Sequence, residues 1–231
     1  MSRWKPQEIV ACCAFILTIP ACYELDKVPP PNADSVASGC GSYAFLIYEP
    51  KELASLQDLP ERIRTDLVAH LQSRLGKPFY SRLRFRGGYV YNINELYRVE
   101  PETRQYPWKV PSYNLHFGLP MSDEGLNEYC AQIDLDAEGK VMKEIALPPI
   151  SAQPEKSRVV PVQEALRVAG EHGVPVQDAR VELGYDLSQE SLVWMVSYTP
   201  EFTDTEFTRL VLHVNAHTGK FAGWVQMEGH V

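Results

Sequence analysis

Three acidic side chains followed by a glycine have the spacing of the start of a calcium-binding loop. Asp134, Asp136 and Glu138 alternate along the chain, and Gly139 follows them. An EF-hand loop begins in this way, but it needs a bidentate glutamate at its twelfth position. Ile145 occupies that position, and the flanking residues alternate like strands. We therefore predict a turn between two strands here, and no metal site.

Two histidines, His213 and His217, lie four residues apart, which suits zinc when both lie on one helix. The apolar residues around them alternate with a period of two, which indicates a strand followed by its turn. That geometry does not bring the two imidazoles together. His116 and His230 are far away in the sequence, so we predict no metal and no other cofactor.

Three arginines, Arg82, Arg84 and Arg86, alternate with Leu83 and Phe85 and so line one face of a predicted strand. Such a face could meet anionic lipid head groups, a polyanionic glycan or the acidic face of a partner. The alternative is a solvated strand face that opposes aggregation.

The sequence contains no signature of hydrolase, nucleotide-binding or metalloprotease activity. It has no G-x-S-x-G, no phosphate-binding glycine loop and no H-E-x-x-H motif. We therefore predict a protein that is not an enzyme. The formal net charge of −8 opposes contact with nucleic acid phosphates, so no nucleic acid partner is expected.

Residues 1–21 have the pattern of an export signal, with a basic start and an apolar stretch too short to span a membrane. They end in Ile-Pro-Ala before Cys22, which resembles a bacterial lipoprotein signal. This resemblance implies a lipid on Cys22, a membrane anchor and a place in the cell envelope. Tyr23 after the cysteine implies the outer membrane facing the periplasm, if the host is Gram-negative. An ordinary secretory signal or an uncleaved anchor are the alternatives.

Residues 22–41 have the composition of a flexible tether, including a run of three prolines. Removal of residues 1–21 and lipidation of Cys22 would leave two further cysteines, Cys40 and Cys130. In an oxidising compartment they form one possible disulfide, and the alternative is two buried thiols.

Apolar periodicity divides the rest into two units, residues 42–150 and 158–231. A helix is expected at about 60–76, with apolar residues four apart, and another at 161–172. Strands follow each helix, and Gly87-Gly88 suggests a hairpin turn. Residues 94–111 are polar and rich in proline, and we expect them to be largely loop. The predicted fold class is α+β, with two tandem units of a helix on an antiparallel sheet.

Both units contain a segment with the same turn chemistry. The segments 133–141 and 210–221 share the same closing pattern. In each, Asp or Asn is followed by Ala, and Gly-Lys and an apolar residue come at the end. Aligning Leu135 with Val214 keeps the apolar faces in phase and places one extra residue in the second turn, around Thr218. We expect Gly139 and Gly219 to have positive φ at corresponding turn positions.

The second unit resembles a PepSY-type domain. The resemblance rests on Glu164-Ala165, on the strand around Trp194 and Val196, and on the hairpin from Val214 to Lys220. It covers about residues 159–226 and departs from the pattern at Asn215, where Asp is usual. The first unit shares only the segment 133–141 with this pattern. The helix-on-sheet shape is also similar to cystatin-like inhibitors, but no inhibitory loop motif accompanies it.

The resemblance implies an accessory, binding or inhibitory role in the cell envelope, and it carries no catalytic residues over to this chain. We therefore expect a non-catalytic envelope lipoprotein that binds an unknown envelope protein or glycan. The alternatives are an inhibitor or regulator of an envelope peptidase or hydrolase, and an envelope assembly factor.

Overall fold

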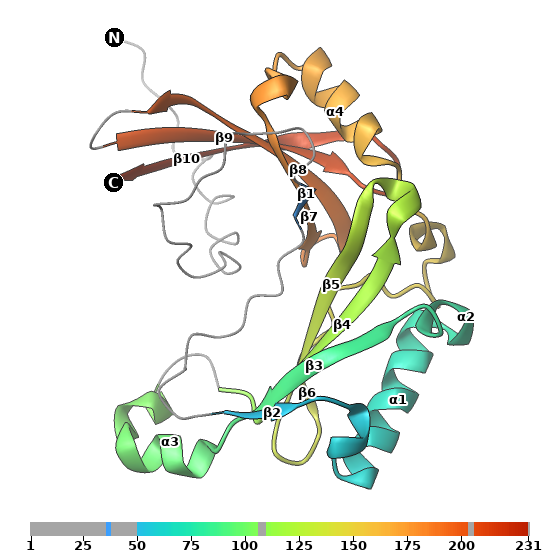
Figure 1. Ribbon diagram of the computed structural model, residues 1–231, viewed down its shortest axis with the longest axis vertical. Helices are drawn as coiled ribbons and strands as arrows, with labels where there is room; N and C mark the ends of the chain where they lie inside the picture. Colours follow the sequence, from blue (N-terminus) through green and yellow to red (C-terminus); the bar gives the residue numbers. More distant parts are fainter. Residues whose placement is uncertain (1–35, 38–49, 106–109, 203–205, 231) are drawn as a thin grey trace, which may run out of the picture.

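The computed structural model describes residues 36–37, 50–105, 110–202 and 206–230 (Figure 1). Within them the chain forms two five-stranded sheets, one from each half, with helices packed against them. All strand pairs are antiparallel except the short pairing of β1 with β7. The α+β class predicted from periodicity is confirmed.

The first sheet has the strand order β2-β3-β4-β5-β6. Its strands are β2 (Lys51–Leu53), β3 (Arg84–Val90), β4 (Tyr113–Met121), β5 (Leu126–Leu135) and β6 (Val141–Lys143). Its helices are α1 (Glu61–Leu75), α2 (Lys77–Tyr80) and α3 (Ile93–Val99). The four-residue spacing places one stripe of α1 against the sheet, and all of its members are buried: Ile63, Leu67, Leu71 and Leu75.

Two predictions in this half are wrong. Gly87 and Gly88 lie inside β3, at a bulge opposite β4, and form no hairpin turn. A Cβ on Gly88 would lie 2.6 Å from the carbonyl oxygen of Asn114, so the glycine serves close strand packing instead. The segment 94–111 is not largely loop, because α3 and a 3-10 helix at Pro101–Gln105 occupy much of it.

The second sheet has the strand order β1-β7-β8-β9-β10. Its strands are β1 (Val36–Ala37), β7 (Arg180–Asp186), β8 (Ser191–Phe202), β9 (Glu206–Asn215) and β10 (Phe221–His230). One helix, α4 (Val162–Glu171), packs on β8 and β9. It begins after Pro161, whose fixed φ suits a helix start, and ends shortly before Gly173.

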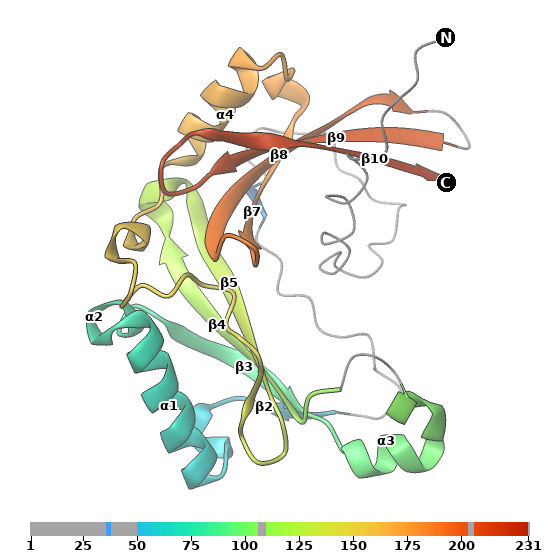
Figure 2. The ribbon, with the colours of Figure 1, turned by 180° about the vertical axis from the view of Figure 1, so that it is seen from behind.

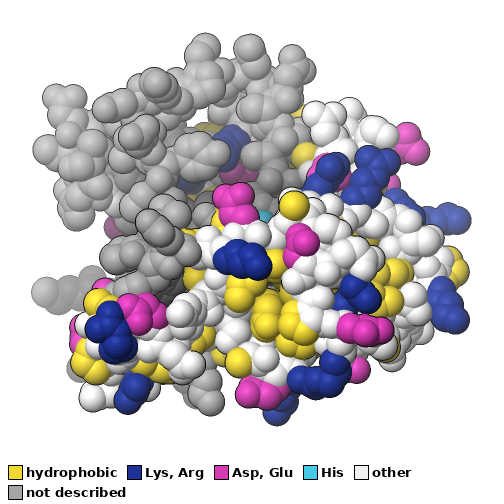
Figure 3. Space-filling model, turned by 60° about the horizontal axis from the view of Figure 1, so that its bottom comes forward, with side chains coloured by type: hydrophobic (Ala, Val, Ile, Leu, Met, Phe, Trp, Pro, Cys, Tyr) yellow, Lys and Arg dark blue, Asp and Glu magenta, His cyan; other side chains and the backbone are white. Residues whose placement is uncertain are grey.

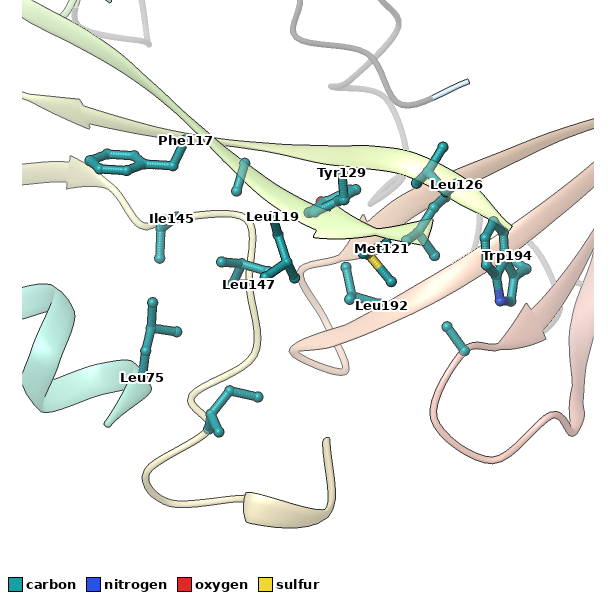
Figure 4. Close-up of a cluster of buried hydrophobic side chains, with 14 of the residues drawn as sticks. Leu75, Phe117, Leu119, Met121, Leu126, Tyr129, Ile145, Leu147, Leu192 and Trp194 are labelled. Atoms are coloured by element: carbon teal, nitrogen blue, oxygen red, sulfur yellow. The ribbon is translucent and has the colours of Figure 1, made fainter. Parts of the chain in front are cut away.

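The two sheets share one continuous hydrophobic core. Figure 4 shows Met121 and Leu126, at the ends of β4 and β5, beside Leu192 and Trp194 of β8. All four side chains are at least 96% buried. In Figures 1 and 2, α1 and α4 lie on the same outer side of the bent pair of sheets. The opposite face of each sheet has no described helix packed across it.

Candidate functional site

The residues that carry the family resemblance converge on the short segment that leads into α4. The indole Nε1 of Trp194 donates to the carbonyl oxygen of Val160 at 3.0 Å. The backbone N–H of Val160 donates to the carbonyl oxygen of Ala216 at 2.7 Å. His217 Nδ1 lies 2.7 Å from the carbonyl oxygen of Arg158. These three hydrogen bonds together fix residues 158–160, the segment that precedes α4.

The two Gly-Lys turns have the geometry expected from their sequences. Gly139 has φ +85° and Gly219 has φ +69°. The side chain of Asp136 accepts hydrogen bonds from two backbone N–H groups of its turn, and Asn215 does the same in the other. Asn215 therefore keeps the acceptor that Asp provides in the usual pattern. The closing backbone bond spans one more residue in the second turn, so the extra residue lies there as predicted.

Each turn glycine touches the third residue of the helix in its own half. A Cβ on Gly139 would lie 2.9 Å from Cγ1 of Ile63 in α1. A Cβ on Gly219 would lie 3.1 Å from Cγ of Glu164 in α4. The hairpin turns therefore pack against equivalent positions of the two helices. The glycines of the two motifs and the side chains of Asp136 and Asn215 are therefore engaged in turn formation and helix docking.

His217 is held as a neutral imidazole. Its Nε2 accepts the backbone N–H of Leu192 at 3.1 Å, so the proton must be on Nδ1, which donates to Arg158. Burial lowers the pKa of His217, and the hydrogen bond to Arg158 opposes this shift. Protonation of Nε2 would place two donors face to face and break the bond to β8.

Acid should therefore weaken the contribution of His217 to stability. The pKa is lower in the folded chain than in the unfolded one, so the contribution is complete above about pH 6.5 and is lost as the pH falls toward the folded pKa. The stability difference between wild type and His217→Gln should shrink from about pH 7.5 to about pH 5, by no more than about 1.4 kcal/mol per pH unit.

Urea unfolding across this range measures the effect, with His172→Gln as the control at an exposed histidine. His116 and His213 also have pKa values lowered by burial, so wild type itself should lose stability in acid, and only the difference between variants isolates His217. A difference that stays constant with pH would contradict the assignment.

The acidic residues of the calcium-like spacing do not share a site. Asp134 is buried in β5, whereas Asp136 bonds the backbone of its own turn. His213 lies in β9 and His217 in the following turn, where both of its nitrogens are engaged. Among the described residues, no three histidine, cysteine or acidic side chains are grouped for a metal ion.

A buried polar chain on the helix-free face of the first sheet was missed from the sequence. Asn114 Nδ2 donates to Asp134 Oδ1 at 2.6 Å, and Asn114 Oδ1 lies 2.7 Å from His116 Nε2. The amide oxygen can only accept, so His116 donates from Nε2 and keeps Nδ1 as an acceptor. Tyr89 contacts this imidazole edge to face. The alternation of β4 and β5, which places these side chains on one face, was the available signal.

Burial favours the neutral forms of His116 and of the neighbouring Tyr91. It lowers the pKa of His116, against the opposing charge of Asp134. It also raises the pKa of the neighbouring Tyr91 to about 12, with smaller contributions from Tyr89 and Asp134. Asn114 is fully buried, so the chain holds neighbouring strands together and offers a ligand little polar surface.

The three arginines of the predicted patch are exposed, but they do not form a free cationic face. Arg86 makes a two-point ion pair with Glu128, with Nε 2.7 Å from Oε2. Arg82 precedes β3, and its guanidinium lies over the ring of Phe79. Figure 3 shows basic and acidic side chains interspersed over the face it presents. Local charge near β3 is therefore partly balanced.

A second polar cluster, also missed from the sequence, joins the two halves. Arg74 of α1 is 14% exposed, and it donates to the carbonyl oxygen of Leu147 at 3.1 Å. The same guanidinium reaches Tyr185 and Glu190 near the β7–β8 turn. Lys156 donates to two backbone carbonyls of that turn. The Arg74 bonds join the second sheet to α1, and the Lys156 bonds join it to the 3-10 helix Pro154–Ser157 between the halves.

The predicted lipidation and disulfide sites fall largely outside the described residues. Cys22 and Cys40 both lie there. Cys130 lies on β5 and is not a free thiol. The pairing of Cys40 with Cys130 stays a prediction. Among the described residues, no helix is long and apolar enough to cross a membrane.

β10 is the one long strand that lies at a sheet edge in the described part of the chain. Its only described neighbour is β9, so the other side of its backbone has no strand partner among the described residues. Three large apolar side chains on it are exposed: Phe221 at 40%, Trp224 at 41% and Met227 at 38%. The two open cavities of about 410–420 Å³ lie elsewhere, along α1. An unpaired strand can accept another strand through backbone hydrogen bonds.

Comparison with known proteins adds no relative. No family model matches this chain, and neither a curated protein nor a solved structure is similar to it.

Proposed function

We propose that this chain is a non-catalytic binding protein of the cell envelope, which recruits an extended segment of another polypeptide along β10. The observation that carries the proposal is the length and exposure of that edge. β10 has ten residues, and its backbone groups facing away from β9 have no described partner. Strand addition to such an edge gains main-chain hydrogen bonds, while exposed side chains such as Trp224 select the partner.

The predicted patch of Arg82, Arg84 and Arg86 is less suited to be the main binding surface. Any anionic partner would have to compete with Glu128 for Arg86, because that carboxylate already makes a two-point ion pair. Binding of a glycan or lipid head group there would therefore lose much of its electrostatic gain. The backbone edge of β10 has no such competitor within the described part of the chain.

The scaffold in this proposal is a pair of PepSY-like units. In both halves a helix precedes four strands that pair in sequence order, β3 to β6 and β7 to β10. The paired contacts of Gly139 with Ile63 and of Gly219 with Glu164 support a shared ancestry of the halves. A scaffold repeated in this way, with its motif residues engaged internally, suits a binding role.

A lipid on Cys22 would anchor this scaffold, with residues 22–41 as the tether. The proposed location is the outer membrane facing the periplasm, for a Gram-negative host. Cys22→Ala should transfer the protein from the membrane fraction to the aqueous fraction after cell breakage. Unchanged partitioning would contradict the anchor without touching the role of β10.

The binding role is tested by photocrosslinking in intact cells. A photoreactive amino acid in place of Trp224 should form crosslinks that the same residue in place of Met142 does not. Met142 is 36% exposed on β6, a short edge strand of the first sheet, and so serves as the matched control. Mass spectrometry then identifies the captured chain. A peptidase would indicate inhibition or regulation, and an assembly complex would indicate an assembly factor. Equal crosslinking at both positions, or none, would overturn the proposal.

A further inference from the structure

The edges of the two sheets differ sharply in length. Three of the four described edge strands have two or three residues: β1, β2 and β6. The fourth, β10, has ten. Short edges are one means by which proteins prevent unwanted strand pairing, and a long edge lacks that protection. Among the described residues, β10 is therefore the one long strand at a sheet edge.

The sequence of β10 also lacks the usual charged protection. Between Phe221 and Gly229 the only ionisable side chain is Glu228, and no lysine or arginine interrupts the strand. A bulge between Phe221 and Gly223 affects its start alone, because the register with β9 is regular from Gly223 onward. From Gly223 onward, no bulge interrupts the pairing of the strand with β9.

We infer that the segment that occupies this edge is β10 of a second copy of the chain, paired antiparallel about a two-fold axis. The inference rests on the proposed binding role of β10 and names its partner. Such a pair is self-complementary, because each copy presents the same edge and no further edge is opened. The second sheet of one copy would join the second sheet of the other, and together they would form one sheet of ten strands.

The charges at the two ends of the strand favour the antiparallel self-pair. Lys220 immediately precedes β10, and Glu228 lies near its end; both are exposed. Antiparallel pairing centred at Val225 places Lys220 of each copy diagonally across from Glu228 of the other, about two residues from the directly opposite position. The complementary contact occurs twice, once on each side of the axis. A parallel pair would instead place like charges together.

The apolar side chains gain cover from the same arrangement. Trp224 lies opposite Leu212, which faces the core, so its indole is on the α4 side of the sheet. Because α4 packs on β8 and β9, this part of β10 is left exposed. In the pair, the two Trp224 side chains would lie between the two α4 helices. A membrane anchor would assist by raising the local concentration of copies.

The test uses charge variants at Gln226, which is exposed and lies beside the midpoint of β10. Pairing centred at Val225 places the two Gln226 side chains diagonally across the axis, so they come close together. Gln226→Lys and Gln226→Glu are each expected to raise the dimer dissociation constant at least ~10-fold, because like charges meet. An equimolar mixture of the two variants should recover dimers. Light scattering of the full chain in one detergent, over a range of protein concentrations, measures the masses.

Met142→Lys is the matched control, since it adds the same charge to the short edge strand β6 and should leave the dimer intact. Circular dichroism checks that each variant is folded. A monomeric wild type whose Trp224 position crosslinks to a different protein would overturn this inference and leave the proposed function standing. A dimer that persists in both Gln226 variants would overturn it as well, since another surface would then form the interface. A monomer without crosslinks would overturn both.

Discussion

Replacing Trp194 by alanine should lower the free energy of unfolding by about 3–5 kcal/mol, the usual range for removal of a large buried aromatic side chain. Trp194 has no exposed surface and lies where the two sheets share their core (Figure 4). Its indole also holds Val160, and through it the start of α4. A loss of this size is comparable to the total stability of a marginal domain, so much of the variant should be unfolded near physiological temperature.

Urea unfolding followed by circular dichroism measures this loss, and two further variants locate its source. Trp194→Phe retains most of the volume but leaves the Val160 carbonyl without its donor, so it should cost about 1–3 kcal/mol. Trp224→Ala, at a tryptophan that is 41% exposed, is expected to cost the monomer much less. If Trp194→Ala and Trp224→Ala cost the same, the joint between the sheets does not contribute as we describe.

Gly139→Ala should destabilise the protein by about 2–4 kcal/mol, the sum of an unfavourable backbone conformation and a steric clash. The positive φ of Gly139 penalises any side chain. The new Cβ would also lie within 3.0 Å of two side-chain carbons of Ile63, a buried residue of α1 with little freedom to move. The turn and the helix would have to separate.

Gly173→Ala provides the control for this prediction. Gly173 has φ +86°, nearly the same as Gly139, but no atom lies within 4 Å of the position that a Cβ would take, so only the backbone cost of about 1–2 kcal/mol applies. Gly219→Ala should fall between the two, because the flexible side chain of Glu164 can move away. Thermal or urea unfolding of the three variants should rank them in this order, and equal losses at Gly139 and Gly173 would exclude the clash with Ile63.

Local patterns were sufficient where the structure depends on neighbours in the sequence. The four-residue stripe of α1 predicted which side chains are buried, because a helix repeats every 3.6 residues whatever it packs against. The Gly-Lys turns were predicted with their positive φ and with the extra residue in the second turn. These features depend on backbone geometry within a few residues, which the chain specifies directly.

Predictions from local patterns failed where the same short sequence is compatible with two structures. Contacts with residues distant in the sequence decide between the two. Gly87-Gly88 is compatible with a turn, but the approach of Asn114 in β4 requires glycine within a strand. By sequence, Asp134 belongs to an alternating series of acids with calcium-like spacing, yet Asn114 draws it into a buried hydrogen-bond chain. In both cases the deciding atom belongs to a strand at least 20 residues away in the sequence, which no local pattern contains.

By itself, then, the sequence determined helices α1 and α4, the two Gly-Lys turns and the α+β class, because these follow from periodicity and from the allowed φ of glycine. Only the tertiary structure decided that Gly139 faces the rigid Ile63 whereas Gly219 faces the flexible Glu164. It also decided that β10, and no other long strand among the described residues, lies at a sheet edge. Strand order depends on which hydrogen-bonding partners remain after the whole core has packed, and that is a property of the assembled sheets.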